Sequence, residues 1–212
     1  MHIEILVEDL SGKATLDILM PKLIGDKHTF RIHSYKGIGR IPGHMRDATD
    51  PSNRILLANL PKLLKGYGRT FGPHYPAVVI LVCDLDDKNH KQFLKSLQEV
   101  LACCDPRPNT RFCIAVEEGE AWFLGDLHAV KAAYPHAKSP VLNSYENDSI
   151  CGTWEKLADA VFPGGSIALG KLGRQSVGAE KSRWAEKISP QMDVDNNQSP
   201  SFNVFREVVR SL

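Results

Sequence analysis

Acidic residues end the most apolar segments of this chain. The segment 77–83 is followed by Asp84 and Asp86, and the segment 2–7 is followed by Glu8. Alternate residues of an extended chain point to the same side, so Asp84 and Asp86 are expected to face one point. Hard divalent cations are bound by carboxylate oxygens together with water and substrate phosphates. The spacing therefore predicts a binding site for Mg²⁺ or Mn²⁺.

Glu118 and Glu120, which come directly after the next apolar segment, extend this acidic group. If the strands that end at Glu8 and Asp84 are neighbours in a parallel sheet, about 4.8 Å apart, these two side chains converge with Asp86. Adjacent carboxylates repel one another unless a cation lies between them. We therefore predict Glu8, Asp84 and Asp86 as metal ligands. Glu118 or Glu120 is expected to hold a second ion or to orient water.

Other interpretations of the central motif stay open. Asp86 or Asp87 is placed to cap the helix that follows, and Asp84 to accept hydrogen bonds from loop amides. The segment DLDDK at 84–88 is also similar to the nucleophile loop of haloacid-dehalogenase-like phosphatases, although there the motif follows the first strand. An aspartyl-phosphate enzyme is therefore a minor alternative. The segment GSIALGK at 165–171 fails as a phosphate-binding P-loop, because it lacks the final Ser or Thr and follows no expected strand.

Basic residues accompany the acids. The loop 35–46 follows the second expected strand and carries Lys36, Arg40 and Arg46, with glycines that allow close backbone approach. Lys13 lies at the start of the first expected helix, where the helix N-terminus favours anions. We expect Lys13, Lys36 and Arg40 to bind substrate phosphates beside the metal. A solvated surface loop with ordinary basic residues is the alternative.

Strand-like and helix-like segments alternate along residues 1–135. These segments must position the acidic and basic side chains described above. This order predicts an α/β fold with one parallel sheet of about four strands and helices on both faces. The expected strands cover 2–8, 28–35, 77–84 and 111–117, and the expected helices cover 12–24, a segment that begins at Asp50 and Pro51, the segment around 93–101, and 120–134. The carboxyl ends of such strands form the edge at which ligands bind.

Residues 136–212 are predicted to form a helical C-terminal extension packed on the core. Helices are expected near 153–162, 179–188 and 201–211. Ser199 and Pro200 are suited to begin the last of these. Its apolar stripe, which includes Phe202 and Phe205, is expected to pack on the sheet domain, and a docking surface for a partner is the alternative.

Composition excludes several classes of protein. The chain has 212 residues, 42% of them hydrophobic and 24% charged, which is ordinary for a folded globular protein. A net charge of +1 gives no overall basic field for binding nucleic acid, so any such contact must be local. The five cysteines lack the spacing of a zinc site or disulfide framework. Apolar runs are too short to span a membrane, and we expect a cytoplasmic protein.

With acidic residues at the ends of its expected strands, the sequence resembles the Toprim domain of topoisomerases, primases and the overcoming-lysogenisation-defect nucleases. The closer resemblance is to a small stand-alone bacterial Toprim-like family, often encoded beside an ABC-type or AAA ATPase. The motifs that carry it are VEDLSGK (7–13), HSYKGIGRIP (33–42), VCDLDD (82–87), EGEAWFLGD (118–126) and a tail that begins KSRWAEKISPQMD (181–193). One position departs from the nucleases: they often carry a second Glu four residues after the first, where this chain has Gly12.

The resemblance implies a Toprim-like fold and a metal-dependent nuclease that cleaves phosphodiester bonds, as a toxic or anti-phage effector held by an ATPase partner. Its catalytic residues would be Glu8, Asp84, Asp86, Glu118 and Glu120. The implied partners are the ATPase and a DNA or RNA substrate, no membrane is involved, and a homo-oligomer is compatible with this interpretation. The alternative is a non-catalytic module that keeps the Toprim scaffold and regulates the ATPase.

Overall fold

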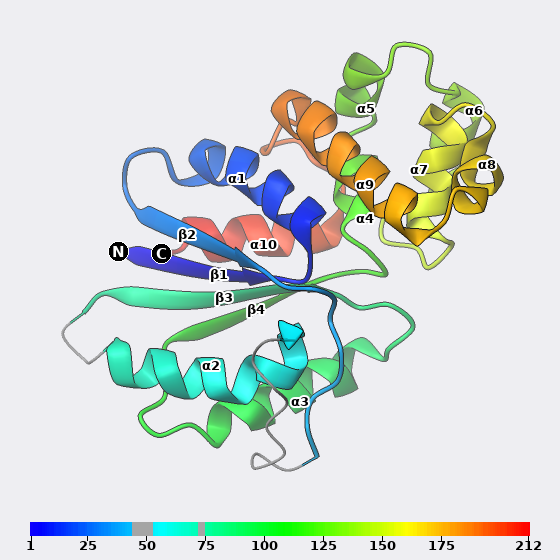
Figure 1. The fold of residues 1–212 in the computed structure, drawn as a ribbon. Helices are drawn as coiled ribbons and strands as arrows, with labels where there is room; N and C mark the ends of the chain where they lie inside the picture. Colours follow the sequence, from blue (N-terminus) through cyan, green and yellow to red (C-terminus); the bar gives the residue numbers. More distant parts are fainter. Residues whose placement is uncertain (44–52, 72–74) are drawn as a thin grey trace.

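A four-stranded parallel sheet forms the centre of the molecule (Figure 1). The computed structural model describes residues 1–43, 53–71 and 75–212. The strands are β1 (His2–Val7), β2 (Thr29–Ser34), β3 (Ala77–Asp84) and β4 (Thr110–Ala115), in the order β2-β1-β3-β4. The predicted α/β class with a parallel sheet of four strands is therefore confirmed.

The two central strands, β1 and β3, are parallel neighbours, with Val7 opposite Val82. β3 is buried up to Cys83, as expected for a parallel strand that helices cover on both faces. The chain leaves β1 toward β2 on one side and leaves β3 toward β4 on the other. This reversal of direction makes the β1–β3 boundary the topological switch point, where open α/β sheets bind their ligands.

Helices cover both faces of the sheet (Figure 1). α1 (Leu10–Ile24) and α10 (Pro200–Arg210) lie on one face, and α2 (Leu56–Thr70) and α3 (His90–Ala102) lie on the other. Each face has its own apolar core because successive strand residues alternate between the faces. α2 begins at Leu56, with Ile55 as its N-cap, and the predicted start at Asp50 and Pro51 lies outside the described residues.

The predicted helix at 120–134 is two helices, α4 (Glu120–Leu124) and α5 (Leu127–Ala133). The break has a local cause, since Asp126 caps α5 by accepting a hydrogen bond of 2.9 Å from the amide of Ala129. Gly125 also packs so closely on Asn197 that a Cβ atom there would lie 2.2 Å from the amide oxygen of Asn197. No larger residue fits at this contact.

The remaining helices follow in the C-terminal part of the chain, where only α7, α9 and α10 were expected. They are α6 (Ser139–Asn143), α7 (Thr153–Val161), α8 (Gly165–Lys171), α9 (Arg174–Ile188) and a 3₁₀ turn, η2 (Ser189–Gln191). α8 contains the rejected P-loop segment and follows α7 rather than a strand. α9 packs along α1 and brings its N-terminal half toward the carboxyl ends of the strands (Figure 1). A division of the chain at residue 135 stays a prediction.

α10 closes the core on the α1 face. Ser199 caps it by accepting a hydrogen bond of 3.2 Å from the amide of Phe202, as predicted. Phe202 and Phe205 are fully buried, and both pack on the ring of Trp122. The apolar stripe of α10 is therefore buried in the core rather than exposed. None of the described helices is long and apolar enough to cross a membrane.

Candidate functional site

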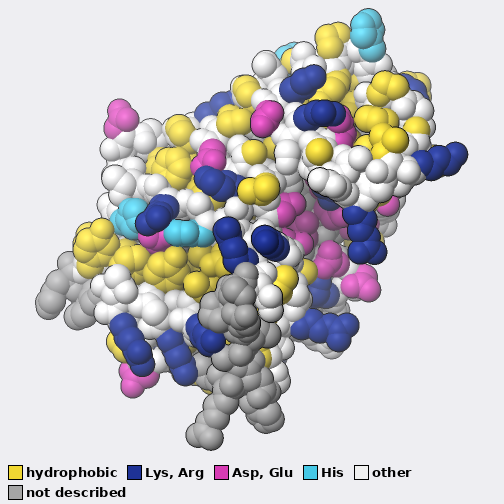
Figure 2. All heavy atoms as spheres, in the orientation of Figure 1, with side chains coloured by type: hydrophobic (Ala, Val, Ile, Leu, Met, Phe, Trp, Pro, Cys, Tyr) yellow, Lys and Arg dark blue, Asp and Glu magenta, His cyan; other side chains and the backbone are white. Residues whose placement is uncertain are grey.

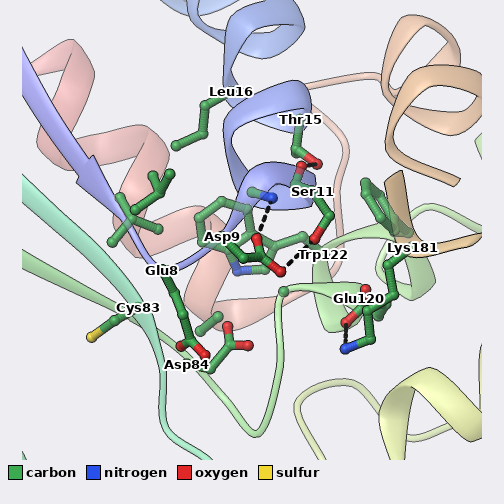
Figure 3. A pocket seen from close by; sticks show the side chains of 16 residues that line it. Glu8, Asp9, Ser11, Thr15, Leu16, Cys83, Asp84, Glu120, Trp122 and Lys181 are labelled. Atoms are coloured by element: carbon green, nitrogen blue, oxygen red, sulfur yellow. Dashed lines mark hydrogen bonds and ion pairs between the residues drawn. The ribbon is translucent and has the colours of Figure 1, made fainter. Parts of the chain in front are cut away.

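Glu8 and Asp84 lie side by side where β1 and β3 end (Figure 3). Their carboxylates face a cavity of about 50 Å³ at the topological switch point. The other polar and charged side chains of its lining are those of Asp9, Ser11, Thr15, Glu120 and Lys181. This volume accommodates an ion with a few water molecules, but it is too small for a nucleotide.

Negative charge accumulates in this cavity. Burial, followed by the charges of Asp86 and Asp9, raises the pKa of Glu8 from its ordinary 4.5 to about 7. The pKa of Asp84 is raised well above its ordinary value, first by burial and then by the charges of Glu8 and Glu120. One oxygen of Glu8, Oε2, is buried without a hydrogen-bond partner among the residues that the structure describes. Two adjacent carboxylates with an unsatisfied oxygen favour either protonation or the binding of a cation.

Asp9, the acid next to Glu8, has a structural role. It is the N-cap of α1 and accepts hydrogen bonds of 2.7 Å from the amide of Gly12 and 2.8 Å from the hydroxyl of Ser11. Gly12, which stands where the resembling nucleases often carry a second Glu, lines the cavity without a side chain. The amide of Gly12 is already donated to Asp9, so α1 supplies no second carboxylate to the cavity at that position.

A lysine from the C-terminal part of the chain enters the acidic group. The ammonium of Lys181, on α9, lies 3.1 Å from Oε2 of Glu120 and 3.2 Å from Oε1 of Glu118. Burial opposes its charge, but Glu120, Glu118 and Asp84 together raise the pKa of Lys181 above its ordinary value. Lys181 is therefore a fixed positive charge whose field also reaches Asp84 (Figure 3).

Glu118 retains an unusual pKa beside this lysine. Burial raises the pKa of Glu118 to about 7, and the charge of Lys181 opposes that increase only in part. Its second oxygen accepts a hydrogen bond of 3.1 Å from the amide of Trp154. Glu118 thus combines a fixed position with a pKa in the range where a carboxyl group exchanges protons at neutral pH.

Sequence reasoning did not assign a role to Lys181, although it lies in one of the resembling motifs. It follows Glu180 and precedes Trp184 along α9, and Trp184 is fully buried. Residues three apart share a face of a helix, so the position of Lys181 three residues before Trp184 placed it on the inward face. The spacing of Lys181 and Trp184 thus indicated an inward-facing lysine, but it did not identify Glu118 and Glu120 as its partners.

Glu117, between β4 and these glutamates, binds the start of α7. Its carboxylate accepts hydrogen bonds from the amides of Cys151, Gly152 and Thr153, at 3.1, 2.8 and 3.0 Å, and from the hydroxyl of Thr153. Burial alone would raise its pKa, but the hydroxyl and the three amides lower it below the ordinary value. Glu117 therefore anchors the C-terminal helices to the end of β4.

Asp86 lies just outside the cavity of Glu8 and Asp84. Its carboxylate pairs with the ammonium of Lys88, and it lines an outer pocket of about 260 Å³ with Asp87, Glu117 and Glu118. Figure 2 shows Asp and Glu side chains gathered in a hollow of this face. The cap of α3 is Asn89, which accepts a hydrogen bond of 3.1 Å from the amide of Gln92. The alternative in which Asp86 or Asp87 caps that helix is therefore wrong.

The predicted phosphate-binding residues lie at the rim or beyond it. The ammonium of Lys13 is 2.8 Å from a carboxylate oxygen of Asp17 on the surface of α1. Lys36 and Arg40 are exposed in the loop after β2, and Arg46 lies outside the described residues. The amide of Gly37 donates a hydrogen bond of 3.0 Å to the carbonyl of Glu8, so this loop borders the cavity through its backbone.

The cavity offers the carboxylates of Glu8 and Asp84 to a divalent cation. Within the described parts of the chain, no group of three or more His, Cys, Asp or Glu side chains is already arranged around a common metal position. Glu8 and Asp84 nevertheless supply adjacent carboxylates, and the buried Oε2 of Glu8 lacks a partner. Mg²⁺ is commonly held by one or two carboxylates with water completing its shell. The pair Glu8 and Asp84 fits that pattern.

Cysteine chemistry does not compete with this interpretation. All five cysteines are unpaired, and Cys83 lies beside Asp84 with its thiol buried. Burial raises the pKa of Cys83 well above its ordinary value, so the thiol stays protonated and is a poor nucleophile.

Comparison with known proteins adds no relative. No protein-family model matches the chain, and neither a curated protein nor a solved structure matches it significantly. The fold and the site therefore rest on the residues and geometry described above, and membership of the Toprim-like family stays a prediction based on the five sequence motifs.

Proposed function

We propose that this protein is a metal-dependent nuclease of Toprim type that cleaves phosphodiester bonds. It acts in the cytoplasm as a toxic or anti-phage effector, together with an ABC-type or AAA ATPase. One observation carries the proposal: Glu8 and Asp84 form an adjacent carboxylate pair at the switch point of the sheet, with one buried oxygen unsatisfied and the ammonium of Lys181 nearby.

In this proposal Glu8 and Asp84 hold one Mg²⁺ or Mn²⁺. Such an ion supplies polarisation of a phosphoryl oxygen and a lowered pKa of bound water. Lys181 lies on the opposite side of Asp84 from Glu8 in Figure 3 and offers a positive charge to the phosphate. Glu118, whose pKa is about 7, is suited to accept a proton from water and release it again at neutral pH.

The size of the cavity constrains how a substrate approaches. About 50 Å³ admits an ion with water, so the scissile phosphate must stop at the mouth. The outer pocket there is lined by Asp86, Asp87, Glu117 and Glu118, which repel a polyanion. Substrate binding therefore depends on cations, and Lys36 and Arg40 on the neighbouring loop are candidates for this role because both are exposed.

A cleavage assay tests this function. Labelled single-stranded DNA, duplex DNA and tRNA are incubated with Mg²⁺ or Mn²⁺, with and without the ATPase. Glu8→Gln and Asp84→Asn should abolish cleavage while the far-ultraviolet circular dichroism stays unchanged. Glu99→Gln, which removes a carboxylate from the exposed side of α3, is the matched control and should cleave like the wild type. Absence of cleavage by the wild type on every substrate, with the ATPase present, contradicts the proposal.

A second function has support of its own. Glu117, Glu118 and Glu120 all have protein partners, so part of the acidic group is explained by structure alone. This favours a non-catalytic module that uses the same scaffold to regulate the ATPase. Such a module should change the ATP hydrolysis rate of its partner, and Asp84→Asn should leave that effect intact. Loss of the regulatory effect together with loss of cleavage in Asp84→Asn argues against the module.

A further inference from the structure

A second concave site lies on the other face of the sheet, between β2 and α2. We call it the α2/β2 groove, and its volume is about 560 Å³, within the range of roughly 300–1,000 Å³ that is typical of small-molecule sites. Its lining includes Glu4, His33, Arg54, Lys62, Tyr67 and Phe71. None of them lines the cavity of Glu8 and Asp84.

The floor of the groove carries a buried carboxylate in a central strand. Glu4 is only 8% exposed, in a strand that is otherwise apolar beyond its first residue. Its Oε2 is 2.6 Å from Nε2 of His33 and 3.4 Å from the hydroxyl of Tyr67, and its Oε1 is 3.2 Å from Nε2 of His2. A carboxylate accepts about four hydrogen bonds, so Oε1 retains capacity for an N–H donor.

The wall of the groove is aromatic. Tyr67 stacks on Phe71 with ring centroids 5.3 Å apart, and Phe71 stacks on Tyr75 at 5.6 Å, so the three rings form a column along the end of α2. The column ends at Tyr67, which lines the groove. A flat ring that enters the groove can extend the column by stacking on Tyr67. Figure 2 shows hydrophobic side chains in a band beside histidines on this face.

Positive charge lies at the end of the groove near the carboxyl end of β2. Arg54 lines the groove there, and its guanidinium donates a hydrogen bond of 2.5 Å to the carbonyl of Ser34, which fixes its position. Guanidinium and ammonium groups are the usual partners of phosphate. The groove therefore offers an acceptor for N–H groups, a stacking surface and a phosphate-binding end in one continuous site.

We propose that the α2/β2 groove binds a nucleotide whose base carries an exocyclic amino group. The amino group donates to Glu4, the base stacks on Tyr67, and the phosphate lies toward Arg54. Guanine, adenine and cytosine offer such a donor and uracil does not. The ligand is either a free nucleotide or an unpaired base of a nucleic acid strand, since both present the same groups. The site does not depend on cleavage at Glu8 and Asp84.

Calorimetric titration in EDTA tests the proposal without any contribution from metal-dependent cleavage. The wild type is titrated with GMP, AMP, CMP and UMP, and with six-nucleotide single strands of DNA and RNA. We expect at least one amino-bearing nucleotide to bind, and UMP to bind about tenfold more weakly or not at all. Tighter binding of the single strands identifies the strand as the ligand, and equal or weaker binding identifies the free nucleotide.

Three variants complete the test. Glu4→Gln and Tyr67→Leu should each weaken binding about tenfold or more, and Glu99→Gln on α3 should bind like the wild type. Tyr67 lies on the helix rather than in the sheet, so Tyr67→Leu keeps the test decisive if Glu4→Gln fails to fold. Absence of binding to all the probes at millimolar concentration, or wild-type binding by folded variants, overturns the proposal.

Discussion

Two carboxylate pairs lie at the same edge of the sheet, and they differ in what balances their charge. Glu118 and Glu120 share the ammonium of Lys181, at 3.2 and 3.1 Å. Within residues 1–43, 53–71 and 75–212, Glu8 and Asp84 have no such contact, and Oε2 of Glu8 is buried without a partner. Buried carboxylates that lack a counter-charge need either a proton or a cation. The chain itself therefore stabilises Glu118 and Glu120, whereas we propose that a cation completes Glu8 and Asp84.

The difference also shows what the second pair does for the first. Lys181 supplies its charge from α9, so the C-terminal helices are connected to the end of β4 through this ion-pair group and through Glu117. The field of Lys181 reaches Asp84 and lowers its pKa, although burial and neighbouring acids dominate. Glu118 and Glu120 thereby hold the ammonium of Lys181 close to Glu8 and Asp84, but its charge does not neutralise those two acids.

Removal of the shared cation should give the largest effect on stability. Lys181→Met leaves Glu118 and Glu120 buried without a counter-charge, and we expect the free energy of unfolding to fall by about 3 kcal/mol or more. Urea denaturation at pH 7 measures the change. The control is Lys95→Met, which removes an exposed lysine that lies 3.9 Å from Glu99 and should cost less than about 0.5 kcal/mol. Equal losses in the two variants would contradict the role given to Lys181.

The unpaired acids should make stability depend on pH. The pKa of Glu8 is raised from 4.5 to about 7 in the folded protein, so folding binds a proton in this window and stability is lost as the pH rises through it. In EDTA, we expect the wild type to lose on the order of 2–3 kcal/mol between pH 4.5 and pH 7.5 relative to Glu8→Gln. Denaturation curves of both proteins at several pH values measure this difference.

A control and an added cation sharpen the pH experiment. Glu99→Gln removes an exposed carboxylate and should follow the wild-type profile. Mg²⁺ should restore the stability that the wild type loses near neutral pH, because a cation replaces the proton. If the free energies of unfolding of the wild type and Glu8→Gln change with pH in parallel, Glu8 ionises without a loss of stability. That result would contradict the difference between the two carboxylate pairs.

Glu117 allows a smaller test, because its charge is satisfied by hydrogen bonds instead of a lysine. Glu117→Gln weakens the contacts to three amides and the hydroxyl of Thr153, and should cost about 1–2 kcal/mol at pH 7. Its pKa is lowered in the folded state, so this stability is present above pH 4.5 and is lost as the pH falls. The control is Glu155→Gln, in the first turn of α7, the helix whose start Glu117 binds. This change should cost only about 0.5 kcal/mol.

The smallest effect is expected at Lys13, which pairs with Asp17 on the exposed side of α1. The two side chains are 36% and 45% exposed, and such pairs one helical turn apart contribute about 0.5 kcal/mol or less. Lys13→Met should therefore leave the urea midpoint almost unchanged. If Lys13→Met lowers the free energy of unfolding by more than about 1 kcal/mol, the exposed ion pair contributes more to stability than we expect.

The sheet was predictable from the sequence because parallel strands are continuous apolar runs. β3 matches its predicted bounds, 77–84, and the neighbouring strands differ by one or two residues. The position of Glu8 beside Asp84 followed from the pairing of β1 with β3. The helices α6 and α8 were missed because each is only five to seven residues long, too short to show a clear period.

The rest of the site depends on contacts between distant segments. Lys181 meets Glu118 and Glu120 across 63 and 61 residues of chain, and no local pattern encodes that pairing. Glu117 lies directly before the predicted Glu118, but its carboxylate accepts hydrogen bonds from the amides at the start of α7, which are 34 to 36 residues away. Glu4 carried a usable signal, since a Glu within an otherwise apolar strand implies a polar site on one face of the sheet.

Binding of Mn²⁺ shows whether a cation completes the pair of Glu8 and Asp84. Free Mn²⁺ is followed by electron paramagnetic resonance as it is titrated into the wild type, Asp84→Asn, Glu8→Gln and Glu118→Gln. We expect one saturable site in the wild type and in Glu118→Gln, and its loss in Asp84→Asn and Glu8→Gln. Absence of binding by the wild type, or equal binding by Asp84→Asn, would contradict the claim that Glu8 and Asp84 are completed by a cation.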